Sequence, residues 1–313
     1  MTLAASQGTA VDGPTPKLVV GRQPRNRRRW KLIGLAWVAP ALGVYGLFVL
    51  YPLTQTVRYS FYNWDGFGVA TPAGFSNYRS IFSNPELFDS LVHAFVLIVF
   101  FTVLPVGLGL VAAAFMHDLV AGAFSTTARV VLFVPQILPL VGAGIAWTWM
   151  YSSDGLVNQV LRRIDLGSLA RPWLGDFNTA LPAVGVIGTW VALGFCTILL
   201  LSGTSKIDPA LYEAARIDGA GRLREFFVIT LPGLRREVVV CVTVTVIAAL
   251  ASFDVIYVST SGGPGYQTMV PGVEIYRLTF LDQKVGQASA LGVFLALLVL
   301  LVILPIQRLG HES

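Results

Sequence analysis

The sequence is poor in charged residues and in the side chains that usually carry catalysis or bind metals. Only 12% of its 313 residues are charged, against about a quarter in a typical soluble domain, which argues against an ordinary water-soluble protein. It has only three histidines, His93, His117 and His311, and their spacing does not suggest a shared metal site. No phosphate-binding loop of the form Gly-x-x-x-x-Gly-Lys-Ser/Thr occurs, so the chain lacks the usual means of hydrolysing a nucleotide.

Long apolar runs are what the sequence has instead. Its residues are 55% hydrophobic and its mean hydropathy is +0.69. Windows of about twenty residues predict an all-α membrane protein with six spanning helices. The predicted spans are residues 32–53, 89–115, 129–150, 181–203, 237–258 and 286–307. The two cysteines, Cys196 and Cys241, fall within these spans, where a free cysteine behaves as a small apolar residue and no disulfide is predicted.

The distribution of basic residues predicts the orientation. Fifteen of the 22 lysines and arginines precede the first span or lie in loops on the same side, and seven lie in the alternate loops. Because basic residues are retained on the cytoplasmic side, this places both termini and the loop at 204–236 in the cytoplasm. We expect residues 1–31 to form a disordered basic tail and 308–313 a short second one. The cluster of basic residues at 22–31 is expected beside a first span, because it sets the orientation in the membrane. No nucleic-acid partner is therefore predicted.

The 204–236 loop carries strong local signals. Asp208 followed by Pro209 predicts a helix start, because the carboxylate caps free backbone N–H groups and proline fits the first helical position. The helix should run to about Asp218 and stop at Gly219, since glycine reaches the left-handed conformation that a reversal needs. A second, amphipathic helix should follow over 222–230, with Pro232 marking the exit toward the fifth span.

Two interpretations of this loop stay open on these grounds. Ala214 and Ala215 let another surface approach the first helix closely, and Glu213 offers a charge to a basic residue of a partner, which favours a docking element for another protein. Alternatively, the loop is an amphipathic segment that lies on the membrane surface.

The pattern of the loop resembles the EAA loop of permease subunits of binding-protein-dependent ABC importers. The matching residues are Glu213, Ala214, Ala215, Asp218, Gly219, Ile229, Leu231 and Pro232. Related permeases often have a further proline four residues after Pro232, where this chain has Arg236. Features outside the loop resemble the carbohydrate type, the first permease of a sugar or glycerol-phosphate importer pair. They include Tyr51-Pro52, Pro135-Gln136 and Gly262-Gly263-Pro264-Gly265.

The resemblance implies the fold and partners of a type I importer in the cytoplasmic membrane. It implies a second permease as heterodimer partner, two ATPase subunits docked on the EAA loop, an extracytoplasmic solute-binding protein and surrounding lipid. ATP and Mg²⁺ would be used by the ATPase, so this chain would be a transport subunit that binds no cofactor and is not itself an enzyme. The eight matching residues would couple ATP hydrolysis to transport.

Polar and aromatic residues within the spans are the candidates for solute contact. A carboxylate at a span centre costs about 2.5–3.5 kcal/mol unless it faces water or a partner, so Asp254 should point inward, either to solute or as a brace for the turn at Gly262. Gln136 and Tyr257 either bind solute or satisfy freed backbone. Trp147 fits an aromatic interface belt or the pathway, and Trp190 lies nearer a span centre.

Other functional classes find less support. A transporter driven by an ion gradient predicts several ionisable residues deep in the spans, but apart from His93 and Asp254 the predicted spans are nearly bare of them. An intramembrane enzyme predicts paired acids or a nucleophile with its base, and the sequence offers neither. A disaccharide, an oligosaccharide and glycerol 3-phosphate stay open as solutes, since Arg277, expected to be exposed, does not indicate a phosphate site.

Overall fold

The computed structural model describes residues 37–118 and 123–311. The predicted tail at 1–31 and the last two residues of the tail at 308–313 lie outside the described residues. The chain forms two units, Met1–Pro52 and Leu53–Ser313, and each is described by itself. The described part of the first unit is helical and belongs to an apolar helix, Trp37–Tyr59, that includes η1 (Gly46–Leu50) and α2 (Tyr51–Tyr59).

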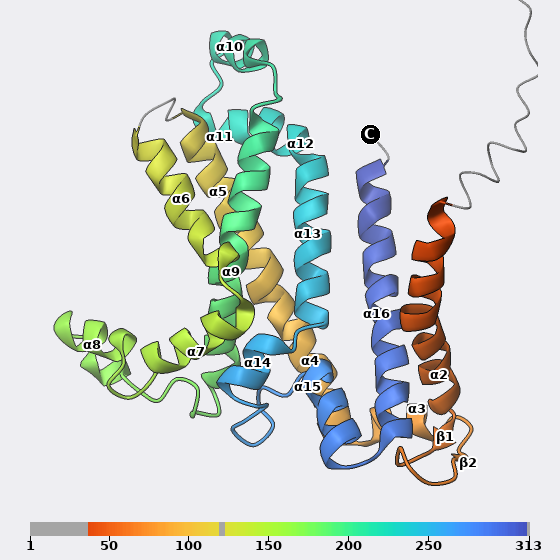
Figure 1. Cartoon of the computed structure of the whole chain (residues 1–313). Coiled ribbons are helices and arrows are strands. Elements are labelled where there is room, and N and C mark those ends of the chain that lie inside the picture. The colour runs from red at the N-terminus through yellow and green to blue at the C-terminus, as the bar shows by residue number, and fades with distance from the viewer. Residues whose placement is uncertain (1–36, 119–122, 312–313) are drawn as a thin grey trace, which may run out of the picture. The chain divides into compact units, whose positions relative to one another are not determined.

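Helices make up nearly all of the second unit (Figure 1). Within the described ranges the only strands are β1 (Tyr62–Asn63) and β2 (Thr71–Pro72), a two-residue antiparallel pair. The predicted all-α class is therefore confirmed.

Four helices in the described part of the chain are long and apolar enough to cross a membrane. One is Trp37–Tyr59. The others are α4–η2–α5 (Pro85–Ile98, Val99–Val103 and Leu104–Asp118), α9 (Ala180–Thr204) and α16 (Val285–His311). The π-helical turn η2 ends two residues before Pro105, which has no N–H to give to the preceding turn.

The third predicted span, 129–150, is not a single helix. It divides into α6 (Ala123–Ile137) and α7 (Leu140–Met150), and the two segments meet at 107°. Pro139 lies at the break with φ −57° and ψ 135°. Proline cannot donate a helical hydrogen bond and pushes the preceding residue out of the helical conformation, which explains the bend. With this pair counted as one span, the described residues hold up to five.

The fifth predicted span, 237–258, is not a single helix either. It divides into α13 (Arg235–Leu250) and α14 (Asp254–Ser259). The 16 residues of α13 measure about 24 Å at 1.5 Å per residue, less than the roughly 30 Å of a bilayer core. Helix α15 (Pro271–Tyr276) packs into the break, because a Cβ at Gly272 would lie only 2.7 Å from the carbonyl oxygen of Ser252.

The connections gather at two opposite ends of the second unit (Figure 1). One end holds α3 (Ser76–Ser83), α8 (Leu156–Arg163) and α15. These helices lie in the loops that follow the first, third and fifth predicted spans. The 204–236 loop lies at the other end. This alternation matches the predicted topology, and which end faces the cytoplasm stays a prediction. We call the two ends the outer end and the loop end.

Helix α9 is the centre of the second unit. In α9, 61% of the apolar 18-residue stretch is buried inside the structure, whereas in α16 the buried share of such a stretch is 17%. It packs against α5, α6 and η2, and glycines permit this close approach. A methyl group at Gly188 would overlap the ring of Phe101, and one at Gly194 would overlap the carbonyl oxygen of Leu132.

Candidate coupling loop and solute cavity

The first half of the 204–236 loop folds as its local signals predict. Helix α10 runs over Pro209–Ile217, and the Asp208 carboxylate accepts the N–H of Ala210 at 2.9 Å. Gly219 has φ +77°, the left-handed conformation in which a side chain is strained. The predicted helix and its glycine stop are confirmed.

Two backbone hydrogen bonds close the end of α10. The N–H of Gly219 donates to Arg216 O at 3.0 Å, and the N–H of Ala220 donates to Ala215 O at 2.9 Å. This pair defines the Schellman geometry that satisfies the last carbonyls of a helix. Ala215 thus contributes its carbonyl to the turn as well as a small side chain.

The second half is helical over the predicted 222–230, but in two kinds of helix. α11 (Arg222–Glu225) passes into the π-helical η4 (Phe226–Thr230), which holds Ile229. Leu231 and Pro232 lie in the short α12 (Leu231–Gly233). The chain leaves helical geometry at Leu234, with φ −91° and ψ 5°, so the exit toward α13 does not require a proline at position 236.

Two side-chain contacts hold the halves together. Arg216 reaches Glu225 through Nε–Oε1 at 3.0 Å and Nη2–Oε2 at 3.4 Å. The Tyr212 and Thr230 hydroxyls are 3.0 Å apart and buried. Because Glu225 is buried as well, α10 is fixed on the second half rather than free to swing on its turn.

The outward surface of the loop combines charge with apolar side chains. Glu213, Ala214 and Asp218 are exposed, and Glu213 has no ion-pair partner among the described residues. Ile217 is 86% exposed and Leu223 78%. Sequence analysis did not select these two, although apolar residues in a loop predicted to face water were the available signal. Ala215 and Ile229 differ, since they line a small cavity of about 150 Å³ between the halves.

The two broken helices open onto one cavity of about 360 Å³, here called the Asp254 cavity. Gln136 comes from the end of α6, beside the first break. Ser252 and Asp254 come from the second break. The floor is apolar and includes Phe101 and Gly188 of the central packing. Two of the predicted solute residues, Gln136 and Asp254, are therefore brought together although 118 positions separate them in the sequence.

Ser252 is the residue of this cavity that sequence analysis missed. It is 6% exposed, and its buried Oγ has no hydrogen-bond partner in the described part of the chain. A buried hydroxyl without a partner is uncommon and costly. Together with a carboxylate and an amide, it gives the cavity both donors and acceptors for a hydroxylated ligand.

The remaining predicted solute residues lie beside the cavity. Trp147 and Trp190 pack edge to face with ring centroids 5.6 Å apart, and Trp147 also contacts Tyr151 at 5.0 Å. Neither tryptophan lines the Asp254 cavity, and their solute roles stay predictions. Tyr257 stacks at 5.1 Å on Phe253, which does line it.

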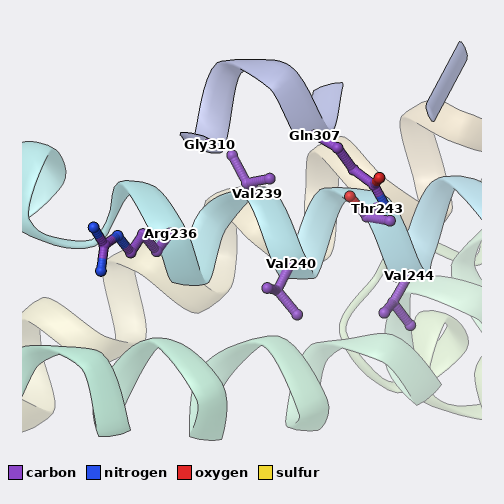
Figure 2. A pocket seen from close by; sticks show the side chains of 7 residues that line it. All are labelled: Arg236, Val239, Val240, Thr243, Val244, Gln307 and Gly310. Atoms are coloured by element: carbon purple, nitrogen blue, oxygen red, sulfur yellow. The ribbon is translucent and has the colours of Figure 1, made fainter. Parts of the chain in front are cut away.

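A second, larger cavity of about 660 Å³ lies toward the loop end, between α13 and α16. Figure 2 shows that Val239 and Thr243 lie on the side of α13 toward α16 and Gln307, whereas Val240 and Val244 project from the other side. Arg236 lies at its end, and we call it the Arg236 groove. Val244 lines both this groove and the Asp254 cavity, so the two adjoin along α13.

Arg277 is more enclosed than the sequence suggested. Its side chain is only 21% exposed and pairs with Glu274 at 2.8 Å, Glu86 at 3.1 Å and Asp282 at 3.4 Å. Its guanidinium donates hydrogen bonds to the Glu274 carboxylate, and these raise the pKa of Arg277, which therefore stays charged. Its partners, rather than its exposure, argue against a phosphate site here.

Comparison with known proteins decides the family. The family described as the inner membrane component of binding-protein-dependent transport systems matches residues 105–310. The chain belongs to this family. It is a multi-pass membrane permease subunit of an ABC importer, as the EAA resemblance implied.

Individual permeases from other organisms are similar to this chain along most of their length. The sulfoquinovosyl glycerol transport permease SmoG of Agrobacterium fabrum is 34% identical over 288 residues, covering 89% of this chain and 91% of SmoG. The diacetylchitobiose uptake permease NgcF of Streptomyces coelicolor is 31% identical over 307 residues, with 93% and 86% covered. A bacterial ABC importer of the acidic polysaccharide alginate matches with a TM-score of 0.75 at 22% identity over 91% of this chain and 96% of that one. The structural match shows the ABC importer permease fold.

Proposed function

We propose that this permease carries a sugar or related hydroxylated solute across the cytoplasmic membrane, paired with a second permease and driven by two ATPase subunits. The observation that carries the proposal is the Asp254 cavity, onto which both helix breaks open and in which the Ser252 hydroxyl lacks a protein partner. Discontinuous helices at a cavity are typical of transport sites, because freed backbone and polar side chains are tolerated only beside water or solute. The sugar compounds in the names of SmoG and NgcF support the solute class.

The solute follows α13 in this proposal. It binds first among Gln136, Ser252 and Asp254, and it leaves by the Arg236 groove. Val244 lines both spaces and so lies between the two ends of the path. In transport, these two ends open alternately. The second permease completes the walls of the path.

The 204–236 loop lies in the cytoplasm and receives an ATPase subunit. Glu213 accepts hydrogen bonds from a basic residue of the ATPase, while Ile217 and Leu223, both exposed, enter an apolar groove. ATP and Mg²⁺ bind to the ATPase and not to this chain. ATP changes access only if it binds the two transport conformations with different affinity. The Arg216–Glu225 contact carries that difference from α10 into the helix leading to α13.

An uptake experiment tests the proposal. The permease is reconstituted in proteoliposomes together with its second permease, ATPase and solute-binding protein. ATP-dependent uptake is measured for diacetylchitobiose, sulfoquinovosyl glycerol and glycerol 3-phosphate. Asp254→Asn should raise the apparent KM about 10-fold or more, because hydrogen bonds to a charged group contribute about 1.5–3 kcal/mol. Asp89→Asn, at an exposed acid of α4, is the matched control and should leave it unchanged. Uptake of none of these solutes by the complete complex, or an unchanged KM in Asp254→Asn, contradicts the proposal.

A further inference from the structure

Four aromatic rings form a strip from the Asp254 cavity toward the outer end. Phe253 and Tyr257 stack with centroids 5.1 Å apart and an interplanar angle of 13°. Tyr276 contacts both, at 5.9 Å and 5.1 Å. Phe280 extends the series, 5.1 Å from Tyr276. We call these four residues the aromatic strip.

The strip joins the cavity to the protein surface. Its inner ring, Phe253, lines the Asp254 cavity next to Asp254 itself. Its outer ring, Phe280, is 68% exposed, and Tyr257 is exposed between them. The hydroxyls of Tyr257 and Tyr276 lie 3.5 Å apart at an exposed position. The strip therefore combines apolar ring faces with two adjacent hydroxyl groups.

Around this route carboxylates outnumber the one arginine that they engage. Asp254 is the only charged residue among those lining its cavity in the described part of the chain. At the outer end, Arg277 follows Tyr276 directly but is engaged by three carboxylates, those of Glu86, Glu274 and Asp282. An anionic solute would meet like charge at Asp254, and at the outer end it would find the charge of Arg277 already neutralised by carboxylates.

We propose that the transported solute is a neutral saccharide whose ring stacks on the aromatic strip as it passes from the outer end to the Asp254 cavity. This inference rests on the proposed function and narrows its solute class. The C–H face of a sugar ring packs on an aromatic face while its hydroxyls bond at the edge, and the strip offers both. Glycerol 3-phosphate has no ring to stack and carries a charge that Asp254 repels.

The competing role for the strip is an interface with the second permease. An interface core is apolar and leaves few polar groups without partners. The exposed tyrosine hydroxyls suit a hydroxylated solute better than an apolar helix face. Co-purification of the second permease distinguishes the two roles.

The test uses the complete reconstituted complex and three probes: neutral diacetylchitobiose, anionic sulfoquinovosyl glycerol and glycerol 3-phosphate. The variants are Tyr257→Ala, Phe280→Ala and the conservative Tyr257→Trp. Phe67→Ala is the matched control, because Phe67 is 87% exposed in the β1–β2 turn and lies outside the strip. The readouts are apparent KM, maximal uptake rate and the amount of second permease that co-purifies.

Wild type should take up diacetylchitobiose in preference to both anions. Each alanine variant should raise its apparent KM about fivefold or more, in line with the loss of one aromatic contact. Tyr257→Trp and Phe67→Ala should stay close to wild type, and the second permease should co-purify equally with all. An unchanged KM in both alanine variants, preference for an anion, or loss of the second permease would overturn the strip as a sugar path. Uptake of no probe by wild type overturns the proposed function as well, so the two failures are distinguishable.

Discussion

Arg216 at the end of α10 and Glu225 at the end of α11 form a two-point ion pair, with Nε–Oε1 at 3.0 Å and Nη2–Oε2 at 3.4 Å. The pair joins helices on either side of the Gly219 turn and so fixes the shape that the loop presents. The buried member is Glu225, because the Arg216 side chain is still 57% exposed. Loss of the arginine therefore leaves a buried carboxylate short of donors.

Arg216→Gln should lower the thermal stability of the purified permease by the equivalent of about 1–3 kcal/mol and reduce uptake. Arg235→Gln, at an exposed arginine in the first turn of α13, is the control and should do neither. In the double variant Arg216→Gln, Glu225→Gln, the loss should be smaller than the sum of the single losses, because the two residues interact directly. Additive losses would show that the pair does not hold the loop.

Glu213→Lys should abolish ATP-driven uptake while the protein still accumulates in the membrane. Glu213 is exposed and has no ion pair within the described residues, so reversing its charge disturbs docking and not folding. Membrane abundance, co-purified ATPase and uptake are measured together. Asp89→Lys reverses an exposed acid at the outer end and should transport normally. Normal transport by Glu213→Lys would remove the coupling assignment.

Gly219→Ala should destabilise the loop by about 1–2 kcal/mol, the usual cost of a left-handed conformation for a residue with a Cβ. The space around Gly219 is open, since nothing lies within 4 Å of a Cβ placed there, so the cost comes from its φ of +77° alone. Limited proteolysis of the loop measures the effect. Gly221→Ser is the control, because that residue has φ −80° and equally open surroundings. Equal protease sensitivity in the two variants would contradict this account.

Ser252→Ala should separate stability from transport. Removing a buried hydroxyl that has no partner in the described residues relieves a desolvation cost of about 1–3 kcal/mol, so thermal stability should hold or rise. Apparent affinity for the transported sugar should fall, because the solute loses a hydrogen bond. Thr245→Val, in the wall of the same cavity, serves as control, since its hydroxyl already donates to Cys241 O at 2.8 Å. A variant that loses stability and keeps its affinity would show that Ser252 is structural.

Gly272→Ala should displace α15 from the break between α13 and α14. Its Cβ would meet the Ser252 carbonyl oxygen at 2.7 Å, and such overpacking typically costs about 1–3 kcal/mol. Thermal stability and uptake should both fall. The matched change Gly292→Ala brings a Cβ only to 3.8 Å from Ile275, so it should be tolerated. Equal behaviour of the two variants would show that this close approach does not hold the break.

In the 204–236 loop, the local geometry could be predicted from the sequence and the contact between its two halves could not. The start and end of α10 were predicted correctly at Asp208, Pro209 and Gly219. Both depend on contacts between residues a few positions apart, so the residue types in sequence are enough to predict them. The Arg216–Glu225 pair was not predicted, because it requires the turn to bring two helices together at a particular angle.

In the spans, by contrast, the sequence did not predict where the helices break. An apolar run such as 237–258 suits one long helix as well as two short ones, and hydropathy alone favours the single helix. The sequence by itself determined the membrane class, the sugar-permease resemblance and the local geometry of the loop, since all three depend on composition or on near neighbours. Only the tertiary structure decided where α13 ends, because Gly272 brings α15 against Ser252 from twenty residues away. That contact opens the break at which Ser252 and Asp254 meet Gln136 in one cavity.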